Sequence, residues 1–189
     1  FFHANYLISK NKKDKVKKIL SSSLEIYPEN LILNQLKEDF TQRKIFNNQF
    51  DCQDIKHIVA EMLYIVANGL TVQQNYMTSN FYLNLAKHLN SNFISFQTLH
   101  ADNFFVIDEY KEAKSIYNEI QRHGTIYSWF ASKQIAIILI RQEKKKEAIN
   151  FLKKNFQKIK NPTVYELFDY AEFLKNNEKF QESISYYSK

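Results

Sequence analysis

Apolar and polar residues alternate at helical spacing through most of the chain. In residues 60–72, apolar side chains recur at three- and four-residue steps and therefore share one helical face: Leu63, Val66, Ala67 and Leu70. After the polar break from Gln73 to Asn75, residues 76–93 carry a second such face: Phe81, Leu83, Leu85, Ala86 and Leu89. Neither helix could bury its stripe alone, so residues 60–93 predict an αα-hairpin that packs against neighbours.

An alanine returns at nearly constant spacing after this hairpin. Ala67 is followed by Ala101, Ala136 and Ala171, at separations of 34, 35 and 35 residues. Self-similarity at a fixed period of this length is typical of a helical solenoid, in which each hairpin contacts only its neighbours. The sequence therefore predicts an all-α repeat architecture.

The N-terminal part of the chain predicts three more helices. We expect the tail of one helix in residues 1–10, a turn at 11–14 and a second helix to about Ile26, which Pro28 ends. The third helix is expected from Leu31 to about Phe40.

The segment that follows, TQRKIFNNQFDCQD (residues 41–54), looks like a degenerate or inserted half-repeat. Asp51 within it is a good N-cap candidate, because its short carboxylate can accept a hydrogen bond from the first turn of a helix. We therefore expect a long helix to begin near Cys52 and to run to about Val72.

Small and large residues recur at fixed places within each period. Small or compact residues precede the first turn (Ala4, Ala67, Ala101, Ala136 and Ala171) and begin the second helix (Val16, Ser79, Ala113, Ala148 and Ser183). Larger residues follow four places later: Leu20, Leu83, Tyr117, Leu152 and Tyr187. This pattern resembles the tetratricopeptide repeat (TPR) family, in which a small pair lets the two helices of a hairpin approach closely. More loosely, the chain resembles multi-TPR proteins of alphaproteobacteria whose role is poorly defined.

The resemblance implies a right-handed α-solenoid of about five TPR-like hairpins plus the degenerate segment. We predict one solenoid over residues 1–189, with repeats at 1–30 (partial), 31–59 (degenerate or inserted), 60–93, 94–128, 129–163 and 164–189 (truncated). Both ends are expected to be cut from a longer array. The last helix would leave Phe180, Ile184 and Tyr187 facing a missing neighbour, which predicts self-association through that end.

Composition narrows the function classes. Of the 189 residues 44% are hydrophobic, but only two are Gly and two are Pro, which favours long helices and excludes a Gly-rich phosphate loop. The single cysteine, Cys52, excludes an internal disulfide and a multi-cysteine zinc site. No apolar run approaches the roughly 18 residues that cross a bilayer, and no signal peptide is visible. We expect a soluble bacterial protein and leave the compartment open between cytoplasm and periplasm.

Few residues suggest catalytic or metal chemistry. His57 and Glu61 have the i, i+4 spacing of helical metal ligands, but an exposed polar pair is the favoured interpretation. His100 lies beside Ala101 in its repeat and is expected to pack within the array. Cys52 lacks the supporting residues of a nucleophilic dyad. We therefore expect no enzyme, no cofactor and no metal site.

Lysines cluster at residues 10–18 and 144–146, with Lys153 and Lys154 nearby, and the net charge is +6. A solvated face is the favoured interpretation of these clusters. The rival is an electrostatic footprint for RNA, because a period of 34 to 35 residues is also that of pentatricopeptide repeats, which read one base per repeat. The small residues fit the TPR pattern better, so RNA binding is the alternative function.

The TPR resemblance also implies where a partner would bind. In that family the first helices of the hairpins line a concave groove. The resemblance therefore implies that this chain is a non-enzymatic scaffold for a partner peptide or helix of unknown identity. The groove positions carried over to this sequence are Tyr64, Asn68, Thr71, Asp102, Phe105, Val106, Phe130, Lys133, Ile137, Arg141, Tyr165, Phe168, Glu172 and Lys175.

Replacement of a repeat alanine tests the repeat assignment. A bulky residue at position 101, as in Ala101→Leu, should push the two helices of one hairpin apart. This overpacking should lower the free energy of unfolding by roughly 1–3 kcal/mol. Urea unfolding of the variant and the wild type measures this difference. An unchanged transition would show that the repeat positions are wrongly assigned.

Overall fold

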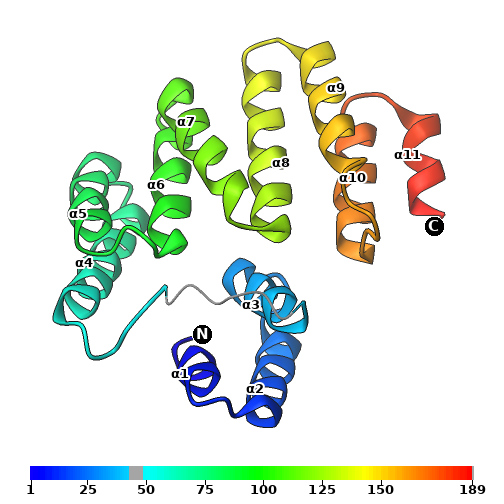
Figure 1. Cartoon of the computed structure of the whole chain (residues 1–189). Coiled ribbons are helices and arrows are strands. Elements are labelled where there is room, and N and C mark those ends of the chain that lie inside the picture. Colours follow the sequence, from blue (N-terminus) through cyan, green and yellow to red (C-terminus); the bar gives the residue numbers. More distant parts are fainter. Residues whose placement is uncertain (43–48, 189) are drawn as a thin grey trace. The chain divides into compact units, whose positions relative to one another are not determined.

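The protein is built from helices arranged as consecutive hairpins (Figure 1). The computed structural model describes residues 1–42 and 49–188, and every regular element within those ranges is helical. The chain forms two compact units, Phe1–Ile116 and Tyr117–Lys189, whose boundary lies within one helix. The predicted all-α helical-repeat fold is confirmed.

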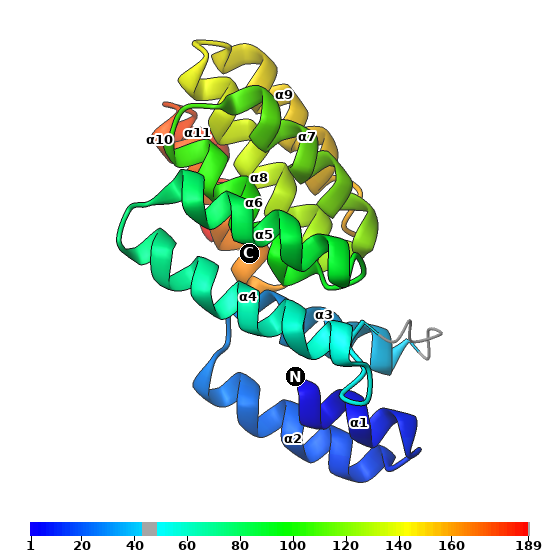
Figure 2. The ribbon, with the colours of Figure 1, turned by 90° about the vertical axis from the view of Figure 1, so that its left-hand side faces the viewer.

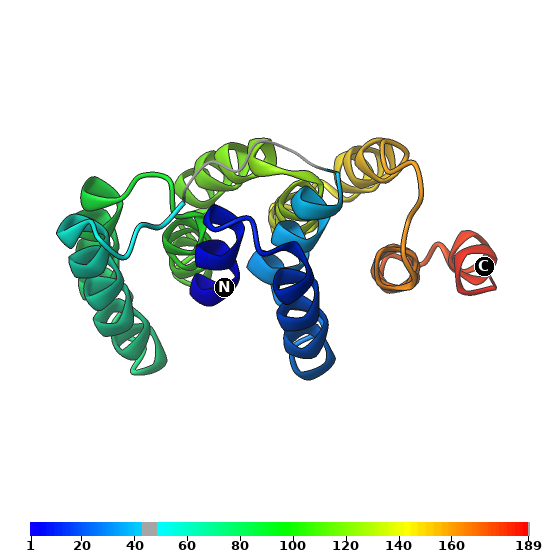
Figure 3. The ribbon, with the colours of Figure 1, turned by 60° about the horizontal axis from the view of Figure 1, so that its bottom comes forward.

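Within the described residues, the first unit has three helices before the segment at residues 42–54, and three helices and part of a fourth after it. In chain order these are α1 (Phe2–Ser9), α2 (Lys13–Ile26), α3 (Leu31–Thr41), α4 (Ile55–Val72), α5 (Tyr76–Leu89), α6 (Ile94–Val106) and the first part of α7 (Tyr110–Ile120). The hairpin of α1 and α2 is clear in Figure 2, and α4 packs along α5 (Figure 3). These bounds match the expected helices to within a few residues.

The second unit continues from the end of α7 through two further hairpins. It contains the short 3-10 helix η1 (Gln121–His123), α8 (Thr125–Arg141), α9 (Lys145–Phe156), α10 (Val164–Asn176) and α11 (Phe180–Tyr187). Thr163 and Glu166 form a capping box at the start of α10, since each side chain bonds to the other residue's backbone N–H. This cap fixes where the helix begins after Pro162.

The start of α4 corrects one prediction. The N-cap is Asp54, whose carboxylate accepts from the N–H of Lys56, and the helix begins at Ile55 rather than near Cys52. Asp51 instead accepts from the N–H of Gln53, in a turn that precedes the helix. Its own N–H donates to Nδ1 of His57. Asp51 and Asp54 are both suitable N-cap residues. The helix uses Asp54, and Asp51 stabilises the turn before it.

The segment between α3 and α4 was expected to be a degenerate half-repeat, and its residues 43–48 lie outside the described residues. The part that follows is held from both sides. Asn5 of α1 donates to the carbonyl oxygen of Phe50, and Asn90 donates to that of Gln49, each at 2.9 Å. The Phe50 ring also lies against Phe2 and Phe93. These contacts fix the chain on its approach to α4.

The small repeat residues lie where the two helices of a hairpin meet. Ala67 and Ala171 are fully buried, and the serines that face them complete a hydrogen bond. Oγ of Ser79 donates to the Ala67 carbonyl at 2.9 Å, and Oγ of Ser183 donates to the Ala171 carbonyl at 2.7 Å. A serine is therefore as suitable as an alanine at this contact, because it is small and its hydroxyl is satisfied.

The turn within each hairpin has one repeated backbone geometry. The second residue after the first helix, which follows its C-cap, has φ between 54° and 65° in all five described turns: Asn11, Gln74, Asp108, Glu143 and Glu178. The next N–H bonds five residues back in every case, as from Lys144 to the Leu139 carbonyl at 2.9 Å. This is the Schellman motif, which satisfies the last carbonyls of a helix. Each of these residues stands seven places after the small residue of its first helix.

Among the described residues, buried apolar side chains form clusters within each unit, including the following three. The first joins α1, α2 and α3 around Ala4, Val16 and Leu20. The second joins α4, α5 and the start of α6 around Ala67, Leu83 and Phe96, and Phe1 and Ile32 pack against both of these clusters. The third lies in the second unit and is rich in rings: Trp129, Phe156 and Tyr170, with Ala136, Leu152 and Leu174.

The turn geometry predicts the effect of a glycine. Glu143 has φ 62°, a left-handed conformation that costs a side-chain-bearing residue roughly 1 kcal/mol more than glycine. We expect Glu143→Gly to raise the free energy of unfolding by about 1 kcal/mol, measured by urea unfolding. Asn11→Gly should give a smaller gain, because asparagine tolerates this conformation. A loss of stability in Glu143→Gly would contradict the turn assignment.

Candidate binding surface

The predicted groove positions of the first unit lie on α4 and α6 and differ in exposure. Asn68 and Val106 are exposed, whereas Tyr64, Asp102 and Phe105 are half-buried. The Tyr64 ring lies 5.3 Å from that of Phe96. Burial, and then the charges of Glu61 and Asp102, raise the pKa of Tyr64 above its ordinary value. Its phenol therefore stays protonated and can donate to a ligand.

Thr71 is engaged in a polar network between helices. Its hydroxyl lies 2.8 Å from Oγ of Ser79 and donates to Oδ1 of Asn103 at 2.9 Å. Nδ2 of Asn103, which is fully buried, donates to Ser79 and to Oδ1 of Asn80, both at 2.9 Å. The network joins α4, α5 and α6. Because the Thr71 hydroxyl is already used, its main role in this structure is to hold these helices together.

The predicted groove positions of the second unit lie on α8 and α10. Ile137 and Arg141 of α8 are exposed, and so are four residues of α10: Tyr165, Phe168, Glu172 and Lys175. Phe130 and Lys133 are half-buried. The face thus offers aromatic and aliphatic surface next to both signs of charge, a composition found at many protein interfaces.

An ion pair and a ring cluster hold α8 and α10 together beneath this face. Lys133 pairs with Asp169, whose Oδ2 also accepts from Nε1 of Trp129 at 3.1 Å. Beside them Tyr170 stacks on Phe156, with centroids 4.4 Å apart and planes 13° apart. Burial raises the pKa of Tyr170 above its ordinary value. The exposed side chains of α10 therefore project from a backbone that is fixed on two sides.

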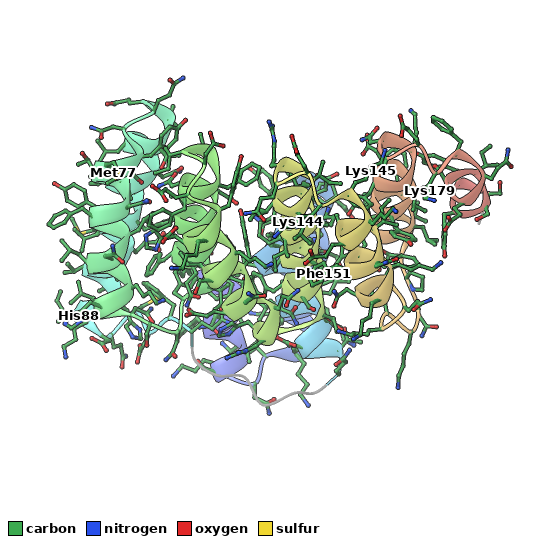
Figure 4. All side chains as sticks on the ribbon, turned by 90° about the horizontal axis from the view of Figure 1, so that it is seen from above. Met77, His88, Lys144, Lys145, Phe151 and Lys179 are labelled. Atoms are coloured by element: carbon green, nitrogen blue, oxygen red, sulfur yellow. The ribbon has the colours of Figure 1, made fainter. Side chains whose placement is uncertain are left out.

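The lysines of the second unit gather where two turns adjoin. Lys145 at the start of α9 pairs with Glu178 in the turn before α11, close to Lys144 and Lys179 (Figure 4). Lys153 pairs with Glu182 at 3.8 Å. The hydrogen bond and charge of Lys145 lower the pKa of the Glu178 carboxyl. Two of the lysines in these clusters thus share their charge with acidic neighbours, while Lys144 and Lys146 are exposed.

The α4–α5 hairpin presents an apolar surface that the sequence analysis missed. Val66, Phe81 and Leu85 were assigned to buried faces but are exposed. On α4 the exposed apolar side chains extend along the whole helix, and α5 adds Met77 (Figure 4). By length and composition alone α4 could cross a membrane, although no unbroken apolar run suggested this. The sequence did contain a sign of this surface, because α4 has more apolar residues than a single buried helical face can accommodate.

The other residues considered for catalysis or metal binding have structural roles or, within the described part of the chain, do not come together as a site. His57 accepts from the Asp51 N–H, and its Nε2 lies 3.7 Å from Asp54, so it supports the start of α4. Cys52 is exposed. Among the described residues, no three His, Cys, Asp or Glu side chains come together as a metal site would require.

Comparison with known proteins gives a similarity to solved structures. No protein-family model matches the chain, and no curated protein matches its sequence. Among solved structures it is similar to YrrB, described as a TPR protein with an unusual peptide-binding site. The match covers 89% of this chain and 71% of YrrB, at 16% identity and a TM-score of 0.46.

The buried His100 predicts a dependence of stability on pH. It packs beside Phe104, and burial, with the nearby charge of Lys87, lowers its pKa from 6.5 to about 4. Below pH 6.5 the unfolded chain binds a proton that the folded chain does not. Stability should therefore fall between pH 6.5 and 4, by on the order of 3 kcal/mol from this group. Above pH 6.5 His100 contributes no pH dependence.

Urea unfolding across this pH range measures the effect. His100→Phe should flatten the wild-type slope, whereas replacement of the exposed His88 by Gln should leave it unchanged (Figure 4). An equal slope in wild type and His100→Phe would contradict a neutral, buried His100.

Proposed function

We propose that the protein is a non-enzymatic scaffold that holds a peptide or a helix of a protein partner along the first helices of its hairpins. The observation that carries the proposal is the face of α8 and α10, where Tyr165 and Phe168 are 56% and 54% exposed. Large aromatic side chains in water are costly to leave uncovered, and they supply much of the energy at protein interfaces.

The support beneath this face favours specific binding. Asp169 is held by both Lys133 and Trp129, and Tyr170 is packed between Trp129 and Phe156. The α10 backbone is thus fixed before a partner arrives. A preorganised surface loses little conformational entropy on binding, so more of the contact energy remains as affinity.

The rim of this face suggests the character of the partner segment. Arg141, Glu172 and Lys175 are exposed around the apolar side chains Ile137 and Phe168. Mixed charges at a rim set orientation and association rate more than affinity. We infer a partner segment with apolar anchors and flanking polar residues of both signs. In the first unit, a partner would meet Asn68, Asp102, Phe105 and Val106, together with the phenol of Tyr64.

RNA is the alternative partner, favoured by the exposed Lys144 and Lys146. Phosphate contacts would make the affinity fall log-linearly with salt, whereas apolar anchors would be affected little. The pairing of Lys145 with Glu178 and of Lys153 with Glu182 reduces the positive charge available to a nucleic acid. We therefore rank RNA second.

A pull-down with the full-length protein from cell extract, at moderate salt, tests the ranking. We expect a protein partner, whose affinity the double substitution Tyr165→Ala and Phe168→Ala lowers at least about tenfold. Substituting glutamine for Lys144, Lys145 and Lys146 should change that affinity little. Recovery of RNA that survives moderate salt, and that is lost in the lysine variant, would reverse the ranking.

A further inference from the structure

The outer face of α4 is an uncovered apolar surface. We define it by its eight residues, Ile55, Ile58, Val59, Met62, Ile65, Val66, Gly69 and Val72, all of which are exposed. The face lies away from Ala60 and Ala67, which are buried against α5. A continuous apolar face of this length on a folded chain marks an interaction surface.

The same repeat positions are covered in later hairpins. Met62 is 61% exposed, but its equivalents Phe96 in α6 and Glu166 in α10 are 1% and 8% exposed. Val66 is 47% exposed, and its equivalents His100 and Tyr170 are 7% and 0% exposed.

The covering element in those hairpins is a helix. Asn103 of α6 meets Ser79 and Asn80 of α5, and Tyr170 of α10 meets Phe156 of α9. The outer face of α4 is therefore the side on which a repeat normally receives the second helix of another hairpin. Among the described residues, no helix covers Met62 and Val66 of α4, which stay exposed.

The outer face has the spacing of a helix-pairing seam. Ile55, Val59, Met62, Val66 and Gly69 follow one another at alternating steps of four and three residues, as in coiled-coil seams. The chain contains no Asp, Glu, Lys or Arg from residue 62 to residue 86. From Met62 to Val72 the face therefore offers a charged or phosphate-bearing partner no counter-charge, whereas a second apolar helix would meet no repulsion there.

The seam is complementary to itself when one copy is reversed. With a two-fold axis at Met62, Ile55 of one copy lies opposite Gly69 of the other, and Val59 lies opposite Val66. The largest side chain at one end thus meets an open place at the other, because a Cβ added at Gly69 would contact nothing within 4 Å. The symmetry makes this contact twice, as an isologous dimer requires.

We propose that two copies of this chain pair through antiparallel α4 helices, with Met62 at the two-fold axis. The seam from Ile55 to Gly69 is about 21 Å long. A helix pair of this length buries on the order of 1,000 Å² in total, at the small end of specific interfaces. The dimer should therefore form reversibly as the concentration rises.

Sedimentation equilibrium over a range of concentrations tests the pairing. The wild type should dimerise, and Met62→Lys should weaken dimerisation on the order of a hundredfold, because it buries two like charges at the axis. Asn84→Lys, on the exposed side of α5, is the matched control and should dimerise normally. A wild type that stays monomeric throughout, or a dimer that survives Met62→Lys, would overturn the proposal.

The Gly69→Leu variant separates this geometry from general apolar adhesion. In the monomer the leucine has open space and removes the cost of glycine within a helix, so thermal stability should rise. In the dimer it fills the place of Ile55 of the second copy and should weaken pairing at least about tenfold. Stronger pairing in Gly69→Leu would mean non-specific adhesion and overturn the proposal.

Cross-linking tests the orientation in a Cys52→Ser background. A mixture of Ile58→Cys and Val66→Cys chains should join across the dimer with a short thiol cross-linker, and far more than either variant alone. Ile58→Cys joining to itself would indicate parallel helices and contradict the two-fold axis at Met62. Flotation with phosphatidylcholine vesicles tests whether the face binds a lipid surface instead. If the wild type floats as a monomer and the Met62→Lys variant does not float, the face would be assigned to lipid and the dimer proposal would be overturned.

Discussion

The structure depends on the close approach of the two helices within each hairpin. That approach requires a small residue on both sides, as where Ser79 meets Ala67 and Ser183 meets Ala171. Once the pair is close, larger side chains such as Leu83 and Leu174 are buried around it, and the turn between the helices must be short. The recurring left-handed residue provides that turn, so packing and turn geometry repeat with the same period.

The sequence predicted the features that follow from the close contact between the two helices of a hairpin, and few others. The alanine spacing indicated a packed helix at each of Ala67, Ala101, Ala136 and Ala171, where full burial leaves no freedom in residue size. It did not locate the start of α4, where Asp51 and Asp54 are both chemically able to cap a helix. A choice between two equivalent caps depends on tertiary contacts, here the bond from Asp51 to His57.

The surface was harder to predict because an apolar residue does not say what covers it. Val66 and Phe81 fit a helical stripe as well as any core residue, yet both are exposed, and only the structure separates the two cases. The groove positions show the opposite difficulty. Thr71 looked like a surface residue, but its hydroxyl bonds to Ser79 and Asn103 between helices. Polarity alone therefore does not distinguish a binding position from a packing position.

The polar network around Asn103 also fixes how neighbouring hairpins are aligned. Apolar helices can slide past one another by a turn and still bury similar area, so apolar packing alone defines their alignment weakly. Displacing α6 by one turn would separate Asn103 from Ser79, Asn80 and Thr71 and leave its buried amide unsatisfied. The network thus selects one axial setting of α6 against α4 and α5, and with it the relative positions of the side chains that these helices present to solvent.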